Sequence, residues 1–168
     1  MARVFLSLGS NLEPEKHLAA ALAELRDAFG ALDVSPVYRS PAVGFDGPDF
    51  LNLALALDTS LEPVALDTWL HALEDRHGRR RDVPRFSSRT LDADIVLYAD
   101  RVVKGPGNLE IPRGELVKHA FVLKPVLDLA PDLVHPVLGR PLRELWENSA
   151  ASREPIESIG RPGWSRMT

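Results

Sequence analysis

Two aspartates, Asp92 and Asp94, lie two residues apart and lead directly into an apolar run at residues 95–98. Side chains two residues apart in a strand share a face, so a strand here places both carboxylates together, about 7 Å apart along the chain. Two carboxylates this close raise each other's pKa unless a cation lies between them. The pair therefore predicts a site for a hard cation such as Mg²⁺, which takes its remaining ligands from water and phosphate oxygens.

The segment just upstream is rich in arginine, whose forked guanidinium donors match phosphate oxygens. It contains Arg79, Arg80, Arg81, Arg85 and Arg89. An acid pair beside such a cluster predicts a binding site for a metal-bound triphosphate. The alternative is an edge strand with solvated charges, because strands that alternate polar and apolar residues are common.

The composition is typical of a globular protein with one domain. A chain of 168 residues buries a full core without disulfides or structural metals. The net charge of −4 argues against a nucleic-acid partner, and the absence of cysteine excludes thiolate chemistry and fits a reducing compartment. We find no signal-peptide pattern and no apolar run near the about 18 residues of a membrane span. We therefore expect a cytoplasmic monomer or weak homodimer with no membrane partner.

The first part of the chain predicts the elements that position the acid pair. Apolar and alternating runs predict strands over residues 3–8, 32–39 and 50–59. Apolar residues at helical spacing predict helices over residues 14–29 and 63–78.

With the strand that carries the aspartates, the order becomes β-α-β-β-α-β, which is that of the ferredoxin-like α+β fold. This order predicts an antiparallel sheet with both helices on one face. We expect the strand of Asp92 and Asp94 at the centre of the sheet, beside the first strand. Pro36 indicates that the second strand lies at an edge or contains a bulge.

The second part of the chain predicts shorter elements. We expect a hairpin over residues 101–111, a loop or short helix over 112–119, and a short helix over 141–148. Residues 120–127 are apolar, and Pro125 limits them to a short element. Residues 1–149 then form one domain, and the polar residues 150–168, rich in Gly and Pro, form a weakly ordered tail.

Asn52 is the one polar residue in the apolar run 50–57 of the predicted central strand. A buried asparagine must find hydrogen-bond partners. Either backbone groups satisfy it, or the amide is presented to a flat heterocyclic ligand. The long loop over residues 40–49, dense in Pro and Gly, precedes this strand, and loops of that length in compact domains tend to be functional.

Four motifs resemble those of the 6-hydroxymethyl-7,8-dihydropterin pyrophosphokinase family of folate biosynthesis. They are Leu8-Gly9-Ser10-Asn11-Leu12, Tyr38-Arg39-Ser40-Pro41, Asp49-Phe50-Leu51-Asn52 and Arg89-Thr90-Leu91-Asp92-Ala93-Asp94-Ile95. They follow the family's order and spacing across residues 4–148. The last motif is the most specific, whereas the first alone is compatible with any turn.

The resemblance implies transfer of pyrophosphate from ATP to the hydroxymethyl group of the pterin, with release of AMP. It implies that Asp92 and Asp94 hold two Mg²⁺ ions and that Arg79 and Arg89 act with them as catalytic residues. The implied ATP-binding residues are Arg79, Arg81, Arg85, Arg89, Ile95, Arg113 and His119. The implied pterin-binding residues are Ser40, Pro41, Ala42, Val43, Phe50, Asn52, Glu74 and Phe121. For Glu74, a helix-surface glutamate is the alternative.

The chain departs from the family pattern at three places. Phe86 stands where a tryptophan is common, and Arg113-Gly114 follow Pro112 where a histidine-tyrosine pair is common. His119 replaces an arginine two residues before Phe121. Arg113 and His119 thus exchange character, which introduces a residue that titrates near neutrality on the nucleotide side.

Two other functions compete with this interpretation. One is a non-catalytic nucleotide- or RNA-binding module that uses the arginine cluster, which the negative net charge and the lack of exposed aromatic stacking motifs disfavour. The other is a Mg²⁺-dependent phosphohydrolase, which needs a base to activate water, and we find no candidate. His71 and His77 are expected at the helix surface.

Overall fold

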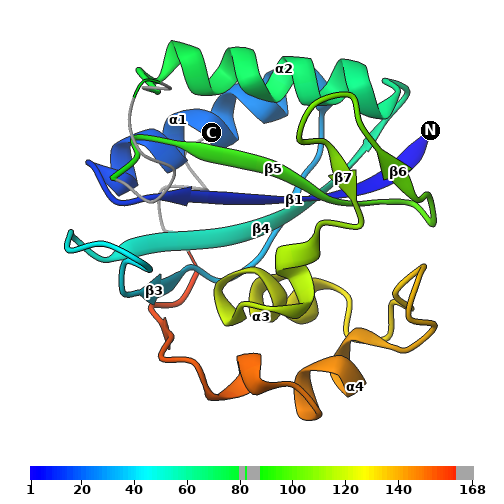
Figure 1. Ribbon diagram of the computed structural model, residues 1–168. Coiled ribbons are helices and arrows are strands. Elements are labelled where there is room, and N and C mark those ends of the chain that lie inside the picture. The colour runs from blue at the N-terminus through cyan, green and yellow to red at the C-terminus, as the bar shows by residue number, and fades with distance from the viewer. Residues whose placement is uncertain (80–81, 83–87, 162–168) are drawn as a thin grey trace.

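The protein is an antiparallel sheet with helices on both faces (Figure 1). The computed structural model describes residues 1–79, 82 and 88–161. The strand order is β5-β1-β4-β3-β8, and β2 also pairs with β4. The strands are β1 Ala2–Ser10, β2 Asp33–Val34, β3 Tyr38–Ser40, β4 Phe50–Thr59, β5 Asp92–Tyr98 and β8 Glu157–Ser158.

Two long helices cover one face of the sheet, as predicted. They are α1, Pro14–Phe29, and α2, Pro63–Arg76. Each begins with a proline in its first turn, where the missing N–H costs no helical hydrogen bond. The buried leucines of the two helices pack on the leucines of β4 that face them and on Val4, Leu6 and Leu8 of β1.

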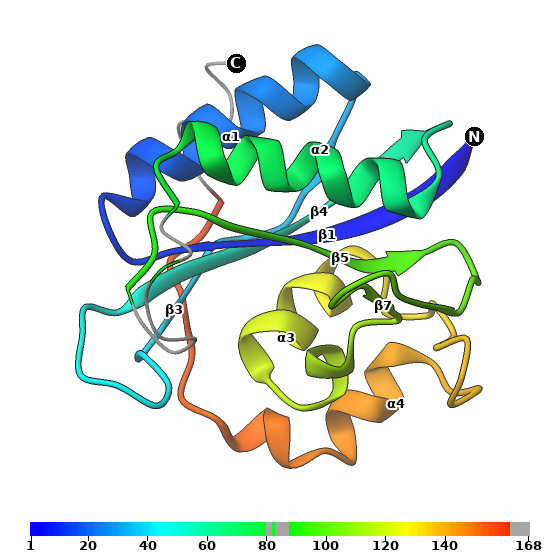
Figure 2. The same cartoon turned by 45° about the horizontal axis from the view of Figure 1, so that its top comes forward.

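The opposite face carries a second core beneath α3, Ala120–Leu129 (Figures 1 and 2). Here Phe5 of β1 and Ala54 of β4 meet the apolar side of α3, and α4, Leu142–Glu147, packs behind it. Pro125 lies inside α3 and does not end it, so the predicted short element extends to ten residues. The helix tolerates Pro125 because the apolar side chains on both sides of it are buried in this core.

The position of β5 differs from the prediction. It pairs with β1, as expected, but it lies at the end of the strand order rather than at its centre. β1 has one edge taken by β4 along nine residue pairs and the other by β5. Within the described residues no strand pairs with the outer edge of β5. The centre of the sheet therefore belongs to β1 and β4.

The predicted second strand is split in two. β2 and β3 both pair with β4, and Ser35, Pro36 and Val37 separate them. Pro36 has no N–H to donate, which breaks the ladder at this point. Ser35 still donates its N–H to the carbonyl of Ala54, at 2.9 Å, so the chain stays against β4 through the break.

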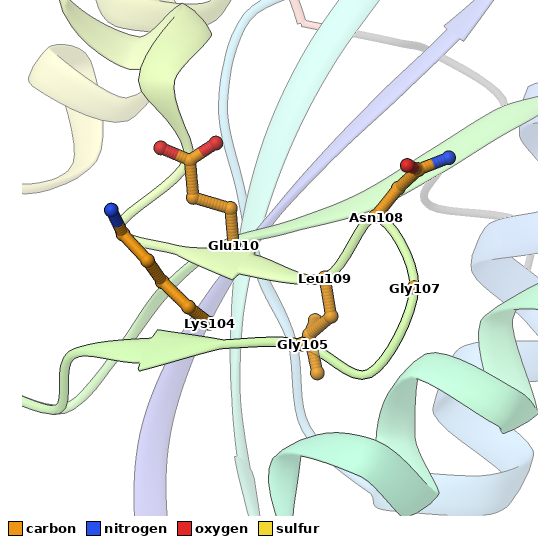
Figure 3. A pocket seen from close by; sticks show the side chains of 6 residues that line it. All are labelled: Lys104, Gly105, Gly107, Asn108, Leu109 and Glu110. Carbon is orange, nitrogen blue, oxygen red and sulfur yellow. The ribbon is translucent and has the colours of Figure 1, made fainter.

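The hairpin and the short helix after β5 occur as predicted. β6, Val103–Lys104, pairs with β7, Glu110–Ile111, and a 3₁₀ helix, η1, spans Gly114–Val117. Figure 3 shows a pocket at the hairpin, lined by Lys104, Gly105, Gly107, Asn108, Leu109 and Glu110. None of these lining residues is a predicted site residue.

Residues 150–161, the described part of the predicted tail, contain regular structure that the sequence did not predict. Residues Ala150–Arg153 form a 3₁₀ helix, η2, and β8 adds an edge strand beside β3. Val37 donates its N–H to the carbonyl of Gly160, and Ile159 donates back to Val37, both at 2.9 Å. Backbone pairing with β3, whose outer edge would otherwise be open, therefore orders residues that a polar composition predicts as tail. None of the helices in the described part of the chain has the length and apolarity that crossing a membrane requires.

Candidate active site

Asp92 and Asp94 lie on the face of β5 that is directed toward η1 and α3. Their neighbours Ala93 and Ile95 are buried in the core beneath α1 and α2, so strand alternation turns the two carboxylates to the opposite face. The two side chains are 36% and 27% exposed, which leaves both accessible to a ligand.

A row of paired residues connects the acid pair with Asn52. Gly9 of β1 lies opposite Asn52 of β4 and also opposite Asp92 of β5. Directly opposite residues share a face, so Asn52 and Asp92 point the same way, about 10 Å apart. Gly9 has no side chain between them, and in the next row only Ser7 stands beside Asp94. Few side-chain atoms therefore stand above the sheet between the Asn52 amide and the two carboxylates.

Three arginines converge on the acid pair. Arg79 Nη1 lies 3.0 Å from Asp92 Oδ1, and Arg89 Nη1 lies 3.7 Å from the same oxygen. Arg113 Nη1 is 3.6 Å from Asp94 Oδ1, and its Nη2 is 3.2 Å from Glu115. The two carboxylates are thus surrounded by cationic donors that also suit phosphate.

The electrostatics of Asp94 reflect its crowded position. Burial raises the pKa of the Asp94 carboxyl well above its usual range, and the charge of Asp92 raises it further, while Arg113 acts in the opposite direction. Burial alone would lower the pKa of Arg113, but Asp94 and Glu115 raise it overall, so Arg113 stays charged. A metal cation beside the two carboxylates would relieve the same repulsion.

The donor set fits Mg²⁺ that shares its ligands with a phosphate. The described residues include no cluster of three or more His, Cys, Asp or Glu side chains able to enclose a metal, so the two carboxylates leave coordination positions for other oxygens. Within the same part of the chain, the buried side-chain atoms without a hydrogen-bond partner are Thr90 Oγ1 and Arg113 Nε. Both belong to residues beside the acid pair, as expected where a polar ligand binds.

The motif at Ser10 and Asn11 holds the segment that leads into the acid pair. Asn11 Oδ1 accepts the Arg89 N–H at 2.7 Å, and the Arg89 carbonyl accepts the N–H groups of Asn11 and Leu12. Asn11 Nδ2 also donates to the Pro48 carbonyl, at 3.0 Å. From the sequence, Ser10 and Asn11 are expected to cap the helix that follows, but α1 has Glu13 at its N-cap and no side-chain cap hydrogen bond. Their actual partners lie far away in the chain.

The Asn52 side chain is buried and donates to Ser40 Oγ at 2.8 Å. The two alternatives were that backbone groups satisfy the amide or that it is presented to a ligand. The contact with Ser40 satisfies the NH₂ end through a side chain, and the oxygen of the amide is left for another contact. Phe50 packs edge-on against Phe45, with ring centroids 6.4 Å apart. Pro41, Ala42 and Val43 follow β3 in the loop, with Pro41 and Val43 exposed.

Tyr38 of β3 lies opposite Asn52 of β4 and connects this edge of the sheet to α3. Its hydroxyl donates to Asp128 of α3. Burial and this contact raise the pKa of Tyr38 above its usual range, so the hydroxyl remains a donor.

Phe121 lies at the N-terminal end of α3 and stacks on His119. The two ring centroids are 4.9 Å apart and the planes meet at 15°. His119 Nδ1 lies 3.2 Å from Glu154 Oε2. The predicted nucleotide-side histidine and the predicted pterin-side aromatic are therefore one stacked pair.

Other predicted residues lie elsewhere. Glu74 is only 3% exposed, so the helix-surface alternative is wrong; its carboxylate accepts from Arg79 and from the Ala93 N–H, at 3.0 and 2.9 Å. The Ile95 side chain is buried in the core, which leaves only its backbone for a nucleotide contact. Arg80, Arg81, Arg85 and Phe86 lie outside the described residues.

The His77 side chain is only 9% exposed, contrary to the prediction of a helix-surface residue. It caps α2, stacks edge-on against His17 of α1, and its Nε2 lies 2.8 Å from Glu24 Oε2. His71 remains on the helix surface, as predicted. Spacing within α2 could not show that α1 covers this end of the helix.

Glu115 and Gly9 complete the set of residues that sequence reasoning missed. Glu115 pairs with Arg113, two residues earlier, and Gly9 separates Asn52 from Asp92. In the sequence, the opposite charges at positions 113 and 115 are a weak signal that Glu115 belongs to the site. Only strand register reveals the place of Gly9.

Fold and site together define a ferredoxin-like α+β protein whose sheet carries an acid pair, phosphate-type arginines and a buried amide on one face. Residues 5–131 match the 7,8-dihydro-6-hydroxymethylpterin-pyrophosphokinase (HPPK) family, and the chain belongs to this family.

Full-length relatives support the family membership. The chain is 45% identical over 165 residues to the 2-amino-4-hydroxy-6-hydroxymethyldihydropteridine pyrophosphokinase of Pseudomonas aeruginosa, covering 94% of this chain and 96% of that protein. It is 34% identical over 146 residues to the protein of the same name from Aquifex aeolicus, covering 86% and 90%. The similarity therefore extends over nearly the whole of each protein.

A solved structure has the same fold. The wild-type HPPK-DHPS of Plasmodium falciparum superposes with a TM-score of 0.67 at 14% identity. The match covers 87% of this chain and 40% of that chain, so this protein spans less than half of that longer polypeptide.

Proposed function

We propose that this chain transfers pyrophosphate from ATP to the hydroxymethyl group of 6-hydroxymethyl-7,8-dihydropterin, giving the pterin diphosphate and AMP in folate biosynthesis. Family membership supports the reaction. The observation that carries the assignment of the site is the row Asn52–Gly9–Asp92, in which an amide and a carboxylate share a face with no side chain between them. The proposal includes a monomer or weak homodimer as the assembly and the cytoplasm as the compartment; a composition without cysteine fits the reducing compartment.

In this proposal Asp92 and Asp94 hold two Mg²⁺ ions that, when bound, neutralise the triphosphate and align it with the acceptor hydroxyl. Arg79 and Arg89 turn from Asp92 toward phosphate oxygens and stabilise charge that develops during transfer. The enzyme forms no covalent intermediate; its contribution is to position the two substrates.

On the acceptor side, Asn52 binds the edge of the pterin ring, and Phe121 stacks on its face. Ser40 fixes the Asn52 amide in one orientation, and backbone groups of residues 41–43 contact the ring. Arg81, Arg85, Arg113, His119 and the Ile95 backbone are proposed nucleotide contacts. For Glu74 we propose a supporting role, because its carboxylate holds Arg79 beside Asp92.

An assay of AMP release tests the reaction. The reaction contains ATP, Mg²⁺ and 6-hydroxymethyl-7,8-dihydropterin, with ATP and Mg²⁺ alone as the control. We expect AMP only when the pterin is present. AMP release without pterin would instead identify a hydrolase, and RNA binding without turnover would identify a binding module.

The Asp94→Ala variant tests the metal assignment in the same assay. We expect AMP formation to fall at least about a hundredfold, since even outer-shell changes at metal sites cost about 10–100-fold. The melting temperature should change little, because the variant loses the cost of burying the carboxylate and its repulsion by Asp92 but also its attraction to Arg113. Asp100→Ala, at an exposed turn just after β5, is the matched control. Near-normal AMP formation by Asp94→Ala would remove the acid pair from the site.

A further inference from the structure

The C-terminal segment, residues 150–161, contacts both α3 and β3, the two elements that form opposite sides, or walls, of the proposed acceptor site. It leaves α4, passes the N-terminal end of α3 and then pairs with β3, as the orange and red ribbon shows in Figures 1 and 2. One wall carries Phe121 at the start of α3. The other carries Ser40 at the end of β3. The family match ends at residue 131, so this segment lies beyond it.

Glu154 binds this segment to the N-terminal end of α3. Its Oε1 accepts the N–H of Ala120, the first residue of the helix, at 2.6 Å, and its Oε2 lies 3.2 Å from His119 Nδ1. A carboxylate at this place satisfies a free N–H of the first turn and complements the positive end of the helix dipole. The carboxylate therefore fixes both the backbone and the side chain that precede Phe121.

His119 passes this constraint on to Phe121. Its ring stacks on that of Phe121 with an interplanar angle of 15°, so the orientation of one ring limits that of the other. Once Glu154 holds the imidazole, the face of Phe121 that is turned away from His119 has a set direction. A ring fixed before the ligand binds loses less conformational freedom on binding.

We propose that Glu154 is a positioning residue for the pterin: through His119 and the first turn of α3 it presets the Phe121 ring against which the pterin stacks. This inference rests on the proposed function. The same segment, through β8, holds β3 and hence the Ser40 end of the site. It thereby sets the distance between the two walls. Loss of Glu154 weakens binding of the pterin more than binding of ATP, which His119 is also proposed to contact.

The test separates the Michaelis constants of the two substrates. For Glu154→Ala we expect the KM for the pterin to rise about three- to tenfold, which corresponds to freeing one or two side chains. The KM for ATP should rise by a smaller factor than the KM for the pterin, because His119 is one of several proposed nucleotide contacts, and kcat should change less than about twofold. Glu154→Gln, which retains an acceptor for the Ala120 N–H, should give a smaller rise and remains measurable if the alanine variant folds poorly.

Glu157→Ala is the matched control. Glu157 lies three residues further along the same segment, its side chain is 72% exposed, and it pairs at the surface with Arg39. We expect both Michaelis constants to be unaffected. Calorimetric titration of each variant with 6-hydroxymethyl-7,8-dihydropterin supplies the same comparison without turnover.

A double-mutant cycle tests the route through His119. If Glu154 acts through the imidazole, Glu154→Ala should raise the KM for the pterin less in a His119→Ala background than in the wild type. A lower melting temperature with an unchanged KM for the pterin, or equal losses for both substrates, would overturn the inference. Failure of the wild type to release AMP in the presence of the pterin would instead overturn the proposed function.

Discussion

In the proposed arrangement of the site, Gly9 lies between the pterin and the triphosphate. It pairs with Asn52 on one side and with Asp92 on the other, at the point where the pterin and the triphosphate are proposed to meet. A Cβ at this position would lie 2.8 Å from Asn52 Oδ1. The end of the Asn52 side chain can rotate away from such a contact, but it would then lose the orientation that Ser40 provides.

We therefore predict that Gly9→Ala weakens pterin binding more than it affects stability. The KM for the pterin should rise about tenfold, the scale of one lost hydrogen bond, whereas the melting temperature should fall by only a few degrees, about what 1 kcal/mol produces. Substrate titrations in the AMP assay measure the first quantity and thermal unfolding the second. Gly114→Ala is the control, because its nearest neighbour, Glu110 Oε1, lies 3.5 Å away. A Gly9→Ala enzyme with unchanged KM would show that the amide does not contact the pterin.

Sequence patterns predict single residues well where the chemistry is local. Alternation alone places Asp92 and Asp94 on one face, because the strand period is a property of the backbone. The same reasoning fails for Glu74, which is buried, and for His77, whose side chain is only 9% exposed. Their burial depends on β5 and α1 respectively, and no spacing within α2 contains that information.

At the scale of elements, Glu74 joins α2 to β5. Its carboxylate accepts from the Ala93 N–H on the strand and from Arg79 beyond the helix end, and Arg79 reaches Asp92 and the Leu91 carbonyl. The helix, the segment after it and the first residues of β5 are thus tied at one buried point.

We predict that Glu74→Ala destabilises the protein by about 2–4 kcal/mol, because it leaves the buried Ala93 N–H without its acceptor and takes one of two carboxylates from the largely buried Arg79 guanidinium. Urea unfolding measures this loss. Turnover should also fall, since Arg79 loses one of the two carboxylates that orient it. Glu62→Ala, which removes an exposed pair with Arg101 at the other end of α2, should cost less than about 1 kcal/mol. Equal stability of the two variants would contradict the role of Glu74.

The elements themselves could be predicted better than their arrangement. The range predicted for α1 agrees with the structure at both ends, because Pro14 and Gly30 are local start and stop signals. The position of β5 at the edge could not be obtained this way, since strand order depends on pairing between distant residues. The pairing of β8 with β3 escaped prediction for the same reason: residues 157–158 have no strand pattern of their own.

At the scale of the whole molecule, two helices meet through a polar cluster on the side remote from α3. His17 Nδ1 lies 2.9 Å from His77 Nδ1, and Glu24 accepts from His77 and from Arg76. Burial and the neighbouring His77 lower the pKa of His17. Burial alone would raise the pKa of Glu24, but the hydrogen bonds from His77 and Arg76 lower it overall.

Both shifts make the folded state less stable in acid. A histidine whose folded pKa is lowered binds its proton more readily in the unfolded chain, so its contribution is present above its ordinary value near 6.5 and is lost as the pH falls below it. The lowered carboxyl of Glu24 contributes above its ordinary value of 4.5, and this contribution is lost at still lower pH. Buried His135 acts in the same direction as His17, whereas the raised pKa of Asp94 acts in the opposite one.

The contribution of His17 to stability in acid can therefore be isolated by comparing the wild type with a His17 variant at two pH values. We predict that the melting temperature is lower at about pH 5.5 than at about pH 7.5 and that His17→Gln narrows this difference by about 2–4 °C, the effect of 1 kcal/mol in a chain of this size. His71→Gln, at an exposed position of α2, should leave the difference as it is in the wild type. Calorimetric scans of the three proteins at both pH values measure the differences. If His17→Gln keeps the wild-type difference, protonation of this cluster does not govern the acid stability of the molecule, and His135 becomes the next residue to replace.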